Sequence, residues 1–288
     1  MSIPNSRRNL DIAIERLAKG SEEAVHIRRT MANAIVGQLL PDGAVKGGSS
    51  LKLRFGDGAT RFSRDLDTAR ASDIDSYVER LEDALASGWN GFTGKLVPGK
   101  PAKPKGVPTQ YIMQPFEVKL SYNGKSWITV PLEVGHNEIG DADDPDMLVP
   151  EDVSRMFVAL GFPPLDPMPF MKLAHQVAQK LHALTEEGSD RVHDLVDLQI
   201  ILREDAPDVV AIKPLCIRLF SYRGMQEWPP RITAYPDWDI GYAAAAEGLD
   251  VLDLEHAITW GNDLIDRIDK CPADLSGQRL RVHDHRPS

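Results

Sequence analysis

One segment, KGGSSLKLRFGDGATRFSRDLD over residues 46–67, constrains the fold of this 288-residue chain more than any other. It opens with Gly47 and Gly48, which are followed by the small hydroxyl residue Ser49. Consecutive glycines let the backbone approach a phosphate closely and present N–H groups to it. A glycine pair alone is most often an ordinary turn, so its meaning depends on the residues that follow.

A pair of carboxylates follows the glycine turn. We expect residues 62–68 to form a strand, on which Asp65 and Asp67 are two positions apart and point from the same face. Two oxygen ligands on one rigid face suit Mg²⁺ or Mn²⁺, which complete their coordination with water and substrate phosphate. Ser63 would share that face, and a phosphate added to it would compete with the nucleotide, so Ser63 is a candidate regulatory residue. The combination predicts a nucleotide site beside a metal site.

Composition limits where such a site is expected to work. The apolar runs are far shorter than the roughly 20 residues of a membrane span, and the first residues lack the apolar core of a signal peptide. Cys216 and Cys271 stand alone, which argues against a disulfide framework or a zinc site. We therefore expect a cytoplasmic globular protein with no membrane partner.

The formal net charge of −10 argues against a surface devoted to nucleic acid, but the charge is uneven. Residues 95–125 contain six lysines and a single acid, whereas residues 126–153 contain eight acids and no Lys or Arg. Such runs are usually solvated loops. The alternative is a basic patch that contacts a polyanion, with Lys100, Lys103 and Lys105 as candidates.

A β-hairpin is the clearest local element. Residues 116–122 and 127–134 alternate between apolar and polar, and Asn123-Gly124 between them is a type I′ turn signal. Pro131 indicates that the second strand lies at an edge or carries an irregularity, because proline cannot donate to a ladder.

The remaining pattern predicts an α+β fold whose second half is largely helical. Residues 51–55 fit either a short strand or a helical turn. Two lobes are expected, residues 1–150 and 151–288, divided near Pro150. Helices are expected over most of the first forty residues, over residues 73–86 with Ser72 as the N-cap, and over residues 170–184, 191–202, 215–222 and 252–268.

Taken together, these motifs resemble a known family. A Gly-Gly/Ser turn followed by Asp-x-Asp is the signature of polymerase-β-like nucleotidyltransferases, and residues 46–67 resemble the first motif of the AbiEii/AbiGii toxins. Residues 179–183 and 191–198 resemble the second motif, a Lys-Leu helix followed by a basic residue and Asp-x-x-Asp-Leu. The similarity covers most of the chain and is strongest to the MenT branch of mycobacterial toxins. One departure is His193, where many relatives place Arg or Lys.

The resemblance implies roles for individual residues. Gly47, Gly48 and Ser49 would bind nucleotide phosphates, and Lys180 would reach the triphosphate. Asp194 and Arg191 are further candidates in the second motif. Without the family, Lys180, Asp194 and Asp197 would be interpreted as a charged helix surface. The expected catalytic residues are Asp65, Asp67, Lys180 and Asp197, with Glu133 as a third metal ligand or a base for the incoming hydroxyl.

The resemblance also implies an activity. The chain would transfer a nucleoside monophosphate from an NTP to the 3′ end of tRNA with Mg²⁺ or Mn²⁺, which would block aminoacylation and translation. A cognate antitoxin would neutralise it. Two alternatives stay open: modification of a protein hydroxyl by the same site, and a non-catalytic nucleotide-binding regulatory module.

Overall fold

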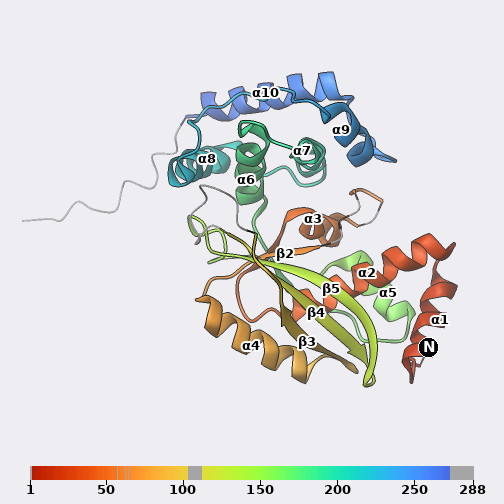
Figure 1. The fold of residues 1–288 in the computed structure, drawn as a ribbon. Helices are drawn as coiled ribbons and strands as arrows, with labels where there is room; N and C mark the ends of the chain where they lie inside the picture. The colour runs from red at the N-terminus through yellow and green to blue at the C-terminus, as the bar shows by residue number, and fades with distance from the viewer. Residues whose placement is uncertain (1, 57, 62, 64, 103–111, 273–288) are drawn as a thin grey trace, which may run out of the picture.

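The computed structural model describes residues 2–56, 58–61, 63, 65–102 and 112–272. The candidate contacts Lys103 and Lys105 lie outside these residues. A mixed seven-stranded sheet forms one half of the molecule and a set of helices the other (Figure 1). The expected α+β fold with a helical second half is confirmed.

The sheet has the strand order β3-β4-β5-β2-β1-β7-β6. Strands β2 and β5 run parallel, as do β1 and β7, and the other neighbours are antiparallel. The strands are β1 (Ala44–Lys46), β2 (Leu66–Ala69), β3 (Phe92–Pro98), β4 (Gln114–Tyr122), β5 (Lys125–Gly135), β6 (Asp146–Leu148) and β7 (Met168–Phe170).

Ten helices are present within the described residues. The first five accompany the sheet, and the last five form the helical lobe in the upper part of Figure 1. They are α1 (Arg7–Leu17), α2 (Ser21–Gln38), α3 (Gly47–Phe55), α4 (Ile74–Ser87), α5 (Glu151–Ala159), α6 (Leu173–Thr185), α7 (His193–Glu204), α8 (Val209–Arg223), α9 (Trp238–Ala246) and α10 (Leu254–Lys270).

The hairpin prediction is confirmed in β4 and β5. Asn123 and Gly124 both have positive φ, 46° and 72°, as a type I′ turn requires. Strand β5 is interior to the sheet, but its pairing with β2 begins only at Leu132. Among the described residues, Pro131 therefore pairs with β4 alone, which explains why the ladder tolerates it.

Two sequence interpretations need correction. The strand expected over residues 62–68 begins only at Leu66, because β1 is three residues long and its ladder with β2 ends at the pair Lys46↔Asp67. Ser63 and Asp65 thus lie outside the strand, and the argument from a shared strand face fails for them. The cap of α4 is Asp73 and not Ser72, since the Asp73 carboxylate accepts a hydrogen bond from the backbone N–H of Ser76.

Helix α3 lies between two hydrophobic cores. Leu53 packs in the core of the sheet half, whereas Leu51 belongs to the core of the helical lobe. Residues two apart on a helix point about 200° away from each other, so one short helix serves both cores. This explains why residues 51–55 alternate like a strand although they form a helix.

The first core continues past Pro150. Val153 and Phe157 of α5 and Phe170 of β7 are buried in the same cluster as the sheet. The helical lobe has its own core, built from α6 to α10. The connection between β7 and α6 thus joins the two halves.

Candidate functional site

A cleft lies between the sheet and the helical lobe. Its volume is about 260 Å³, and its walls come from β1, β2 and β5 on one side and from α6, α7 and α8 on the other. Acidic and basic side chains dominate both walls. The lining residues are Lys46, Gly47, Asp67, Met113, Glu133, Gln176, Gln179, Lys180, Ala183, Arg191, Asp194 and Arg223.

Two carboxylates form the centre of the sheet wall. Asp67 and Glu133 are register partners on the parallel strands β2 and β5, so their Cα atoms are neighbours and their side chains project from the same face. Burial raises the pKa of Asp67 to about 6. The positive charge of Lys46 lowers this pKa, and the negative charge of Glu133 raises it further. Asp65 is exposed, precedes β2 and does not line the cleft. Of the three expected metal ligands, the structure therefore brings together Asp67 and Glu133.

The glycine turn packs directly against these carboxylates. Gly47 has a φ of 68° and begins α3, and a Cβ atom on it would lie 2.3 Å from Oδ2 of Asp67. A larger residue would therefore both strain the backbone and collide with the carboxylate. The first N–H groups of α3 have no partner within the helix, and they begin at this point. The expected phosphate turn and the expected carboxylate thus lie side by side.

Ser49 and Ser63 stabilise the same turn from behind. The hydroxyl of Ser49 lies 3.2 Å from that of Ser63 and also donates to the backbone carbonyl of Asp65. Ser49 is buried, so its side chain supports the turn and does not face the cleft. The regulatory role of Ser63 stays a prediction.

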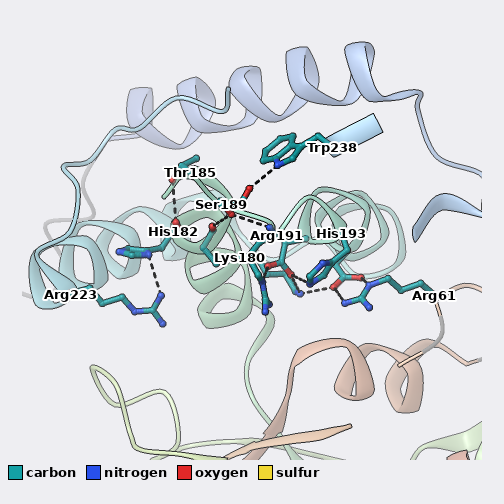
Figure 2. Close-up of polar contacts among 12 residues, drawn as sticks. Arg61, Lys180, His182, Thr185, Ser189, Arg191, His193, Arg223 and Trp238 are labelled. Carbon is teal, nitrogen blue, oxygen red and sulfur yellow. Dashed lines mark hydrogen bonds and ion pairs between the residues drawn. The ribbon is translucent and has the colours of Figure 1, made fainter. Parts of the chain in front are cut away.

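The helical wall is a closed network of ion pairs. Nζ of Lys180 donates to Oδ1 of Asp194 at 2.6 Å and to Oδ2 of Asp197 at 2.7 Å. Arg191 donates to Asp194 at 2.9 Å, and Arg61 binds Asp197 with two hydrogen bonds of 2.8 Å each. Figure 2 shows Lys180 and Arg191 at the edge of the lobe that faces the sheet, with Arg61 extending toward them from the segment between α3 and β2.

Burial and charge act against each other in this network. Burial alone would raise the pKa of Asp197, but Lys180 and Arg61 outweigh it and hold the pKa well below its usual range. Likewise, burial alone would lower the pKa of Lys180, but Asp194 and Asp197 outweigh it and raise the pKa. All four groups therefore stay charged at neutral pH. His193, whose pKa burial lowers to about 4, stays neutral beside them.

Arg191 is fixed at the start of α7 but remains accessible. Its backbone N–H donates a hydrogen bond to Oγ of Ser189 at 3.1 Å. The indole N–H of Trp238 in turn donates to the backbone carbonyl of Ser189 at 2.8 Å (Figure 2). Its side chain is 50% exposed and lines the cleft. The guanidinium of Arg191 is therefore available at the cleft, while its Nε atom donates a hydrogen bond to Asp194.

Sequence reasoning missed several cleft residues. Gln176 lies four positions before Lys180 on α6, so helical spacing predicts that it shares the face of Lys180, whereas Gln179 is adjacent to Lys180 and no spacing rule predicts its place in the cleft. Arg61 does not line the cleft but pairs with Asp197, and the sequence prediction gives it no role although it belongs to the first motif. Arg223 is held by Glu138 at 2.6 Å and comes from a distant helix, and nothing in the local sequence indicates its position.

The carboxylates of the sheet wall suit a divalent metal ion. Within the described ranges, no group of three or more His, Cys, Asp or Glu side chains is arranged to hold a metal ion. Mg²⁺ commonly takes only one or two protein carboxylates and fills its other positions with water and substrate phosphates. Asp67 and Glu133 fit that requirement, because neither side chain has a hydrogen bond or ion pair to another residue of the described part of the chain.

Comparison with known proteins identifies the class. The family described as "Nucleotidyl transferase AbiEii toxin, Type IV TA system" matches residues 29–264. The chain belongs to this family of nucleotidyltransferase toxins, as its motifs predicted. Membership implies an NTP substrate and a cognate antitoxin. None of the curated proteins compared matches the sequence.

Two solved structures are similar to this chain. One is JHP933 from Helicobacter pylori, with 18% identity over 87% of this chain and 93% of that protein, at a TM-score of 0.43. The other is MenT4, a nucleotidyltransferase toxin from Mycobacterium tuberculosis, with 16% identity over 91% of this chain and 97% of that protein, at a TM-score of 0.45. Among the described residues, no helix is both long and apolar enough to cross a membrane.

Proposed function

We propose that this toxin transfers a nucleoside monophosphate from an NTP to the 3′ end of tRNA in the cytoplasm, with Mg²⁺ or Mn²⁺ as cofactor. One observation carries the catalytic part of the proposal. The carboxylate pair Asp67 and Glu133, the glycine turn at Gly47 and the cationic helical wall all line one cleft.

The reaction assigns a task to each wall. A hydroxyl oxygen of the acceptor attacks the α-phosphorus, the bond from that phosphorus to the bridging oxygen breaks, and pyrophosphate leaves while the hydroxyl proton passes to solvent. Asp67 and Glu133 would hold the metal, which supplies positive charge to the phosphates. The first N–H groups of α3 and the exposed Arg191 would bind and orient the nucleotide.

Support for an RNA acceptor comes from the basic stretch. Met113, a cleft residue, lies within residues 95–125, where lysines greatly outnumber acids. A lysine-rich stretch of sequence that contributes a residue to the cleft favours a polyanionic acceptor. The resemblance to the MenT branch agrees with the 3′ end of tRNA, whose modification would stop aminoacylation.

The test incubates the protein with each radiolabelled NTP, total tRNA and total protein, with and without EDTA. Label is expected in tRNA with Mg²⁺ present, and Asp67→Ala or EDTA is expected to reduce it by about a hundredfold or more. Transfer by Asp67→Ala at the wild-type rate would contradict the assignment of Asp67 to the catalytic site. Label in protein instead of tRNA would contradict the acceptor, and NTP binding without any transfer would favour a regulatory module. Asp65→Ala is the matched comparison for the exposed carboxylate, which was predicted to be equally important.

A further inference from the structure

Two lysines line the cleft from opposite walls, and their surroundings differ. Lys180 is almost fully buried, and its ammonium contacts two carboxylates. Lys46 lines the same cleft but makes no hydrogen bond, and no ion pair within 4.0 Å, with any residue in the part of the chain that the structure describes. An ammonium group has three N–H donors, so those of Lys46 are available to a ligand.

The fold makes room for the Lys46 ammonium. Lys46 is the last residue of β1, and its side chain extends across β2 to Gly135 at the end of β5. A Cβ atom on Gly135 would lie 3.0 Å from Nζ of Lys46, so the absent side chain leaves the space that the ammonium uses. Gly135 has no positive φ, so its lack of a side chain matters here for space and not for backbone conformation.

The position of Lys46 also suits a phosphate. It immediately precedes Gly47, where the free N–H groups of α3 begin, and it faces Asp67 across the ladder between β1 and β2. A phosphate at the glycine turn would thus have backbone donors on one side and the Lys46 ammonium on the other. By contrast, Lys180 would have to leave Asp194 and Asp197 to bind a phosphate directly.

We infer that Lys46 binds the β- and γ-phosphates of the NTP and neutralises the pyrophosphate as it leaves. This inference rests on the proposed function and deepens it. The phosphate lysine of this cleft is then Lys46 on the sheet wall, while Lys180 keeps the helical wall in shape.

The test compares NTP and NMP binding. Equilibrium titrations with Mg²⁺ measure the affinity of the full-length protein for ATP, CTP, GTP and UTP and for the four matching monophosphates. Lys46→Met is expected to lower NTP affinity by roughly ten- to a hundredfold, the effect of one charge-assisted contact, and to leave NMP affinity unchanged. Lys46→Arg, which retains the charge, should recover part of the loss.

Gly135→Ala is the matched variant, because it displaces the ammonium without removing it. A smaller loss, again confined to NTP, is expected, and it keeps the test valid if Lys46→Met fails to fold. Equal losses for NTP and NMP would overturn the inference, since Lys46 would then act only by neutralising Asp67. Unchanged NTP affinity in Lys46→Met would also overturn it while leaving the proposed function standing. A wild-type protein that binds no NTP would overturn both.

Discussion

The two walls of the cleft handle buried charge in opposite ways. On the helical wall, Lys180 forms ion pairs of 2.6 and 2.7 Å with Asp194 and Asp197, and Arg61 from the segment between α3 and β2 pairs with Asp197 at 2.8 Å. On the sheet wall, Asp67, Glu133 and Lys46 make no such pair with any residue of the described ranges.

The difference distinguishes charges that support the fold from charges that are available to bind a ligand. Buried charges that only support a fold must be paired, because removing either partner leaves an uncompensated charge in the interior. The charge of Asp67 is unfavourable in the free protein because burial raises its pKa to about 6, and a bound cation would relieve this cost. In the proposed function, the sheet wall would therefore hold the metal and the phosphates, while the ion pairs of the helical wall would keep that wall in shape and position Arg191.

The largest expected effect is on stability, and it concerns Lys180. Lys180→Met would leave Asp194 and Asp197 buried with one cation fewer, so the free energy of unfolding should fall by about 3–5 kcal/mol. Urea denaturation followed by circular dichroism measures this. Lys46→Met is the control, since it removes a lysine of the same cleft without breaking an ion pair, and it should unfold close to the wild-type midpoint. Equal midpoints for the two variants would remove the distinction between the walls.

A smaller effect is expected from pH. His182 is buried, its Nδ1 atom faces Nη1 of Arg223 at 3.2 Å, and burial lowers its pKa from 6.5 to about 4. As the pH falls, His182 therefore binds a proton in the unfolded chain before it does so in the folded protein. The stability that depends on neutral His182 is fully present above pH 6.5 and is lost as the pH falls from about 6.5 to about 4.

The measurement compares the free energy of unfolding of the wild type and of His182→Gln across this range. Asp67 and Asp141, whose pKa values burial raises to about 6, change stability in the opposite direction, so the difference between the two proteins isolates His182. The wild type should lose more stability than the variant on acidification. Parallel curves would show that His182 is not held neutral in the folded state.

Local sequence was sufficient for part of this architecture. The hairpin was predictable because Asn123-Gly124 specifies its own turn, and the glycine turn beside Asp67 was predictable from the motif. Helix α3 was ambiguous, because its alternation reflects burial of Leu51 and Leu53 in two different cores, which only the tertiary structure reveals.

The roles of charged residues depended even more on tertiary contacts. A motif lysine such as Lys180 has the same sequence signal whether it binds a phosphate or two carboxylates. Arg61 and Asp197 are far apart in the chain, so their pairing has no local pattern. The motifs therefore predict which residues come together near the cleft, but not what each of those residues contacts.

The most direct test of the contrast between the walls is an isosteric pair, Asp67→Asn and Asp197→Asn, unfolded in metal-free buffer at pH 7. Asp67 has a raised pKa, so its charge is unfavourable in the folded state, and Asp67→Asn should be as stable as the wild type or more so while transfer activity is lost. Asp197→Asn leaves Arg61 and Lys180 without their shared carboxylate, so the free energy of unfolding should fall by about 3–5 kcal/mol. Equal destabilisation by both substitutions, or a stable Asp197→Asn, would contradict the account.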